Sequence, residues 1–220
     1  MIKNLRSPLV AVVALATGLG LAAGTAHAAK GQWSIGGNFG VGTYSNGAFN
    51  DSLDVLGLKN VKDGLEYGGS IRYGVSPKVA LDYEVNLLNG KVTDDSYSPN
   101  VDISTKSIAL PLSLYYQLAS NDKYAFHFFV GAGPMVSTKW KITDGLTTFE
   151  SKNKTAFYAH GGFEGDLMLS KTVALTARAL GRLAKASDVE DAADPTTKVD
   201  VDLSGAAFSL GLRVFFGSGY

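Results

Sequence analysis

Two histidines, His127 and His160, are the side chains of this sequence best suited to acid–base chemistry. Both lie in segments where apolar and polar residues alternate, and both fall on the polar side, as Glu164 does. A histidine acts as a general base in catalysis when a nucleophile lies within its reach. No motif places a nucleophile beside either ring, so we predict interior hydrogen-bonding roles and no catalytic residues.

Metal and phosphate chemistry have little support in the sequence. Two histidines without cysteine partners or a helix make a poor metal site, and the chain has no cysteine. The stretch Gly131-Ala132-Gly133 lacks the following helix and lysine of a phosphate-binding loop. A group of acidic residues lacks the spaced ligands and glycine of a calcium loop, and we expect it to be a solvated loop: Asp188, Glu190, Asp191 and Asp194. We therefore predict no metal and no cofactor.

The N-terminus predicts export. Lys3 and Arg6 precede an apolar run over residues 9–23, and Ala26-His27-Ala28 forms a small-x-small cleavage site. We expect residues 1–28 to be a signal peptide that is cleaved after Ala28 following Sec-dependent export. The 20 basic residues equal the 20 acidic ones, and loss of the leader leaves a slightly acidic chain. This balance argues against a nucleic-acid partner.

The remaining chain, residues 29–220, alternates with a period of two in eight segments. The last segment, AFSLGLRVFF, places five apolar side chains on one face and small residues with one arginine on the other. The eight segments are residues 32–43, 65–74, 79–88, 105–118, 124–136, 155–167, 172–183 and 207–216. The four long polar connections are residues 44–64, 89–104, 137–154 and 184–198. Short and long connections alternate strictly, as they do in outer-membrane barrels.

Charged residues decide which face of these segments meets lipid. A midplane arginine costs about 2–4 kcal/mol when it faces lipid, and the apolar faces of the eight segment cores carry no charge. The other face combines small residues with an interior charge network: Arg72, Asp82, Glu84, Glu164, Arg178, Arg182 and Arg213. We expect Arg72 to pair with Asp82, and Arg178 to pair within residues 162–164. These observations predict an all-β fold, an eight-stranded antiparallel up-and-down transmembrane β-barrel with a filled lumen.

Three details qualify this prediction. Aromatic residues share one end of the segments, as in an interfacial girdle: Trp33, Tyr73, Tyr116, Tyr124 and Phe216. Pro111 lies inside the fourth segment, where a closed barrel has no free edge, so we expect a bulge or a missing ladder bond. Lys106 lies on the apolar face, near a segment start, where its stem can reach the headgroups.

The chain resembles the small outer-membrane β-barrels, the eight-stranded OmpA/OmpX-like family. The resemblance is most specific at the C-terminus, where the family's assembly signal is matched by Ser209, Gly211, Val214 and Phe216. The family usually ends on the aromatic residue, whereas residues 217–220 follow it here. The resemblance implies the Gram-negative outer membrane as location and insertion by the barrel-assembly machinery. It also implies outer-membrane lipids and lipopolysaccharide as partners.

We weigh three functions. The first is a non-enzymatic barrel with an envelope-structural or surface-interaction role through four long extracellular loops. The second is a small channel or transporter for small or hydrophobic solutes. The third is a lipid-modifying enzyme, because barrels of this size include lipid A deacylases and acyltransferases, although no motif of theirs occurs here. The sequence does not identify a surface ligand.

Overall fold

The computed structural model describes residues 30–216. The predicted signal peptide and residues 217–220 lie outside the described residues. The elements are β1 (Trp33–Thr43), α2 (Gly47–Val55), β2 (Asp63–Ser76), β3 (Val79–Asp94), β4 (Val101–Ala109), β5 (Leu112–Ser120), β6 (Tyr124–Thr143), β7 (Thr148–Glu150), β8 (Lys154–Met168), β9 (Val173–Glu190), β10 (Lys198–Asp202) and β11 (Gly205–Phe216).

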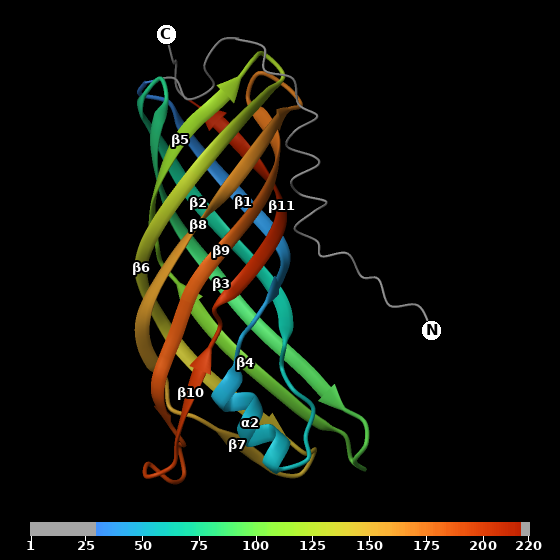
Figure 1. Ribbon diagram of the computed structural model, residues 1–220. Coiled ribbons are helices and arrows are strands. Elements are labelled where there is room, and N and C mark those ends of the chain that lie inside the picture. Colours follow the sequence, from blue (N-terminus) through green and yellow to red (C-terminus); the bar gives the residue numbers. More distant parts are fainter. Residues whose placement is uncertain (1–29, 217–220) are drawn as a thin grey trace.

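The strands form a closed antiparallel ring with eight positions, as predicted (Figure 1). The ring closes because β1 pairs with β2 on one side and with β11 on the other. Two wall positions are each built from two consecutive segments, β4 with β5 and β10 with β11. In the ring, β6 pairs with β4 and β5 on one side and with β8 on the other. No helix among residues 30–216 is long and apolar enough to cross a membrane.

Pro111 interrupts one wall strand. The ladder stops at Ala109 and resumes at Leu112, as a proline without an N–H requires. The wall stays closed there because the Leu110 N–H donates to the Pro134 carbonyl and the Glu84 N–H donates to the Pro111 carbonyl. The predicted irregularity is confirmed, and it is confined to two residues.

The outward face of the strands is apolar over the predicted segments. Ile35 is 51% exposed, whereas Arg72 and Arg178 are 5% and 6% exposed and point inward. The same alternation runs through every wall strand in this part of the barrel. The aromatic residues of the predicted girdle gather at the short-turn end, where Trp33 is in register with both Tyr73 and Phe216.

Three of the four predicted long loops are wrong in large part, because the strands continue through them. β3 extends to Asp94, β6 to Thr143 and β9 to Glu190, while β4 begins at Val101. β6 has 20 residues and β9 has 18, about twice the 9–11 residues that cross a membrane. The alternation continues in these extensions with opposite polarity, since apolar side chains now face inward and polar ones outward. Lys106 therefore lies in the middle of β4 and not near a strand start.

The extensions enclose a second core, which we call the outer core. The residues 44–64 contribute the helix α2, which the sequence analysis did not predict, and which lies across the far end of the barrel (Figure 1). Phe49 and Leu53 of α2 are buried there. The outer core consists of Tyr44, Phe49, Leu53, Val61, Leu88, Val101, Ile103, Ala109, Met135, Trp140, Tyr158, Ala184, Ala186, Val189, Val201 and Leu203.

Asparagine side chains fasten α2 to the wall. Asn50 accepts from the Val61 N–H at 3.0 Å and donates to the Val61 carbonyl at 3.2 Å, like a neighbouring strand. Asn46 precedes the helix with a left-handed backbone and accepts from the Asp202 N–H at 3.2 Å. Because these bonds replace water on buried backbone groups, the helix is held in a fixed position over the barrel.

A β-bulge changes the phase of β6. Ser107 of β4 lies opposite both Ser137 and Thr138, and Ser137 has a left-handed φ of 55°. The Ser107 and Thr138 hydroxyls are 2.8 Å apart and satisfy each other inside the barrel. Beyond the bulge Trp140 faces inward, although it has the same parity as the outward-facing Val136. The extra residue thus reverses the inside and outside faces of the last part of β6.

Candidate functional site

The lumen of the barrel is the first candidate site, because it holds most of the buried charges. The ion-pair network consists of six residues from five strands: Arg72, Asp82, Glu84, Glu164, Arg178 and Arg213. Arg72 lies 2.8 Å from both Asp82 and Glu164. The strand register places Arg72 directly opposite Asp82, the neighbour expected from the hairpin. Glu164 reaches the same guanidinium from the other side of the lumen.

Arg178 pairs differently from the prediction. Its Cα is in register with Glu164, but its guanidinium forms two bonds with Glu84, at 2.7 and 3.1 Å. The expected pair within residues 162–164 is therefore wrong. Glu164 already binds Arg72 and lies 3.6 Å from Arg213. In a narrow barrel an inward side chain reaches across the lumen, so strand neighbours do not determine its partner.

Aromatic rings separate the charges into layers. The Arg72 guanidinium lies 3.6 Å from the centre of the Tyr115 ring, and that of Arg178 lies 4.2 Å from the Phe129 ring. The two rings stack on each other at 4.9 Å. Rings that face guanidinium groups stabilise them in a dry interior through cation–π contacts. Sequence reasoning missed both aromatics, although their inward parity was a usable signal.

Arg182, the remaining predicted charge, lies apart from the ion-pair network. It pairs with Glu66 at 2.6 Å and donates to the carbonyls of Leu203 and Thr43. Its guanidinium lies 4.9 Å from the ring of Tyr44, which belongs to the outer core. Arg182 therefore marks the boundary between the charged lumen and the apolar one.

His160 and Ser113 form a serine–histidine contact that the sequence did not reveal. Ser113 Oγ lies 2.8 Å from His160 Nε2 and 2.7 Å from Glu84 Oε1. Glu84 is held by two bonds from Arg178, so its carboxylate accepts and the serine hydroxyl must donate to it. The remaining contact then needs a donating Nε2–H of His160. A nucleophilic serine would give its proton to the histidine, which is the reverse direction.

Gly131 makes this contact possible. A Cβ at this position would lie 2.2 Å from Ser113 Oγ and 2.5 Å from His160 Nε2. Such a distance is far shorter than any non-bonded contact, so a side chain would displace both groups. The glycine acts here as a spacer inside the lumen and does not form part of a phosphate loop.

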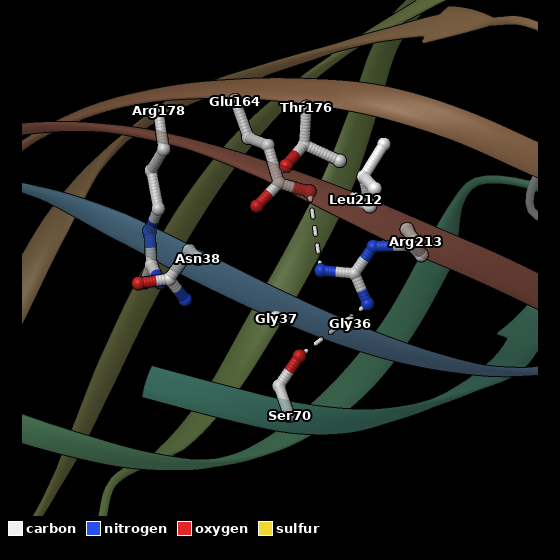
Figure 2. Close-up of a pocket in the computed structure, with 9 residues that line it drawn as sticks. All are labelled: Gly36, Gly37, Asn38, Ser70, Glu164, Thr176, Arg178, Leu212 and Arg213. Atoms are coloured by element: carbon white, nitrogen blue, oxygen red, sulfur yellow. Dashed lines mark hydrogen bonds and ion pairs between the residues drawn. The ribbon is translucent and has the colours of Figure 1, made fainter. Parts of the chain in front are cut away.

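Two small cavities lie beside these charges in the described barrel. The cavity of Figure 2 measures about 10 Å³ and lies between Gly36, Glu164, Arg178 and Arg213. A second, of about 20 Å³, lies near the short-turn end beside His127 and Asp166, which are 3.3 Å apart. These volumes match one water molecule each. Around these cavities the lumen holds the side chains of the ion-pair network and the stacked rings of Tyr115 and Phe129.

The acidic residues near the end of β9 fasten their own turn. Asp191 accepts from the N–H groups of Ala193 and Asp194, and Asp194 accepts from the Thr196 hydroxyl at 2.6 Å. The hydrogen bonds from Thr196 lower the pKa of Asp194 below its ordinary value. These carboxylates already have donors, and no set of three His, Cys, Asp or Glu suited to a metal ion occurs within residues 30–216.

The residues of the C-terminal signal lie in β11, beside β1 and β9. Ser209 is buried and faces the lumen, whereas Val214 and Phe216 are 46% and 44% exposed on the outer face. Gly211 faces inward at a close approach, since a Cβ would lie 2.3 Å from the Gly37 carbonyl oxygen. The segment therefore presents its apolar side chains outward, on the strand that closes the barrel.

The comparisons with known proteins agree with this architecture. The family model of the outer membrane protein beta-barrel domain matches residues 11–216. The chain belongs to this family. Its members lie in the bacterial outer membrane, and so does this barrel, with its apolar belt in lipid. No curated protein matches the chain significantly.

Solved outer-membrane barrels share its fold. OprG from Pseudomonas aeruginosa aligns with a TM-score of 0.51 at 17% identity, over 86% of this chain and 98% of that one. Neisserial surface protein A aligns at 0.50 and 14% identity, over 86% and 99%. Ail of Yersinia pestis, in complex with the heparin analogue sucrose octasulfate, aligns at 0.50 and 13%, over 85% and 99%. Barrels of this family place short turns in the periplasm, so the helix end faces outward from the cell.

Proposed function

We propose that this outer-membrane barrel is a non-enzymatic, closed barrel that acts through its outer wall and its folded extracellular end. The observation that carries the proposal is the double closure of the lumen. The ion-pair network fills the membrane-spanning part, and the outer core under α2 fills the extracellular part. An ion crossing the barrel would have to displace buried ion pairs and then pass an apolar region.

The extracellular end supports a surface role. The turn after β6 is held by Asp144, which accepts from the N–H groups of Leu146 and Thr147, and Leu146 at its tip is 91% exposed. Val55 at the end of α2 is 88% exposed. We propose that these tips contribute to envelope structure or to surface interactions.

Planar-bilayer recording tests the closed lumen. We expect the purified, refolded protein to give no steady single-channel steps, whereas a general porin inserted in the same bilayer provides the positive control. Steady ohmic steps would refute the proposal and favour the channel function. In cells, supplying the protein to a deletion strain should leave solute uptake unchanged. A clear increase in uptake would also refute the closed lumen and favour the channel function.

Mass spectrometry of lipid A tests the enzymatic alternative. The donor direction at Ser113 supports a structural role for His160, and the same role is proposed for His127 beside Asp166. We expect overexpression to leave lipid A unchanged. A modified lipid A that disappears in His127→Ala or His160→Ala, with the barrel still folded, would contradict the non-enzymatic proposal.

A further inference from the structure

The lysines of the extracellular half fall into two groups. One group is neutralised, because each member lies within 4 Å of a carboxylate: Lys59, Lys91, Lys152, Lys185 and Lys198. Five others have no ion pair or side-chain hydrogen bond within residues 30–216: Lys62 precedes β2, Lys154 begins β8, and the remaining three are Lys106, Lys139 and Lys141. These last three lie together on the outer face of β4 and β6, and we call them the lysine patch.

The strand register places the patch in two rows. Lys106 of β4 is directly opposite Lys139 of β6, and Asn89 of β3 is opposite Lys106 on the other side. In the next row Ser104 lies opposite Lys141. Neighbouring strands are about 4.8 Å apart, so these donors cover one continuous area of the wall.

This arrangement opposes the stability of the isolated protein. Like charges directly opposite each other in a sheet are destabilising, and no ion pair relieves Lys106 and Lys139. Lys141 is in register with Glu150 of β7, without forming an ion pair with it. The bulge at Ser137 is responsible, because without the extra residue the last part of β6 would turn Lys139 and Lys141 toward the lumen.

The patch lies where the apolar wall ends. The next outward residues toward the membrane are Ile108 and Val136, which are in register with each other. Beyond the patch the outward residues are polar, as in the pair of Lys91 and Asp102 at 3.1 Å. Lipid headgroups occupy this depth, at the extracellular edge of the hydrocarbon. On β10, another wall strand, the outward charges are Asp200, Asp202 and Lys198, and Lys198 is paired with Glu190 at 3.8 Å.

We propose that Lys106, Lys139 and Lys141 bind the phosphate group of an anionic lipid in the outer leaflet. An ammonium group binds phosphate as a point charge, and a phosphate between two opposed lysines converts their repulsion into attraction. The amide of Asn89 and the hydroxyl of Ser104 supply further donors in the same rows. The inference goes beyond the proposed function and depends only on the outer-membrane location, so it stands or falls independently of the closed lumen.

Nanodiscs of defined composition test the inference. The protein is placed in phosphatidylcholine alone, with bisphosphorylated lipid A, or with dephosphorylated lipid A, and its melting is followed by heat-modifiable gel mobility. We expect the melting temperature to rise by about 3 °C or more with the phosphorylated lipid only. An equal rise with the dephosphorylated lipid would overturn the proposal.

Matched variants assign the rise to the patch. Lys106→Gln/Lys139→Gln should lose the rise and should melt no lower than the wild type in phosphatidylcholine alone, because the repulsion is gone. Lys62→Gln removes a different exposed lysine and should keep the rise. A rise that persists in the double variant contradicts the proposal, and so does a rise caused by a soluble heparin fragment but not by lipid A. A purely structural role of the lysines would lower stability in every lipid, which would also refute it.

Discussion

The two halves of the barrel differ in the chemistry of the side chains that occupy the lumen. In the membrane-spanning half the outside is hydrocarbon, apolar side chains face outward, and the lumen is filled by the ion-pair network. In the extracellular half the outside is water, polar side chains face outward, and the lumen is filled by the outer core. On β9 the change falls between Arg182, which faces inward with Glu66, and Ala184, which is buried among apolar neighbours. The solvent outside the wall therefore determines the interior, while the strand itself is continuous.

The comparison predicts that the largest single effect lies in the ion-pair network. Arg178→Met should destabilise the barrel by about 3–5 kcal/mol, because the buried carboxylate of Glu84 loses its charged partner and the two hydrogen bonds from Arg178. Urea unfolding in lipid vesicles measures this loss. Lys185→Met removes a surface ion pair of 2.8 Å with Asp200 and should cost under about 1 kcal/mol. Equal costs for the two variants would contradict the distinction between the halves.

The outer core should respond locally. Leu53→Ala creates a cavity beneath α2 and should cost the extracellular half about 2–5 kcal/mol, without opening the membrane-spanning strands. Hydrogen exchange should accelerate over residues 47–61 and stay slow around Phe129. Val55→Ala, at an exposed position of the same helix, is the control with little expected change. Faster exchange throughout the barrel would show that the two cores unfold as one.

The bulge that separates the two phases of β6 should show a smaller effect. Ser137→Val places a β-branched side chain on a left-handed backbone and should cost about 1–3 kcal/mol, whereas Ser137→Gly should be close to neutral. The melting temperatures of the two variants in the same detergent measure the difference. Similar melting temperatures would mean that residue 137 does not need a left-handed backbone in the folded barrel.

The smallest effect concerns pH at the β3–β4 tip. The Ser96 side-chain hydroxyl and its backbone N–H donate to Asp94 and lower the pKa of this carboxyl below its ordinary value. These hydrogen bonds therefore stabilise the folded tip at a pH above the ordinary pKa of the carboxyl. This stabilisation is lost as the pH falls through the lowered pKa of Asp94. Amide exchange of residues 95–97 should rise below about pH 4. Asp94→Asn should remove this acid dependence, and a carboxyl that titrates at or above its ordinary value would argue against the account.

Sequence reasoning identified the membrane half because one physical rule covers it. Where lipid surrounds the wall, charged side chains must face inward and apolar side chains outward. The alternation therefore predicted correctly that Arg72 faces the lumen and that Ile35 faces lipid. The same rule concealed the extracellular half. The outward face becomes polar beyond Asn89 and Lys106, so the sequence analysis ended its segments near these residues. The strands in fact continue, and their inward residues, such as Ile103, are apolar.

Two other features depend on distances that alternation does not encode. The partner of Arg178 is Glu84 across the lumen, and only the diameter of the barrel brings them together. The sequence analysis missed helix α2 because the helix has only nine residues and its sequence, GAFNDSLDV, contains the turn-forming residues Asn50 and Asp51. Its helical form depends on burial of Phe49 and Leu53 and on the bonds between Asn50 and Val61.

Cysteine labelling tests the central claim, a closed lumen with lipid on the apolar side of the wall. The chain has no cysteine, so each of three variants carries a single thiol. The thiol of Ser113→Cys faces the lumen, that of Ala132→Cys faces lipid, and that of Leu146→Cys faces the extracellular water. A small water-soluble thiol reagent should label only Leu146→Cys, and a lipid-soluble maleimide should also label Ala132→Cys. Labelling of Ser113→Cys by the water-soluble reagent in the folded protein would demonstrate an aqueous lumen and contradict the account.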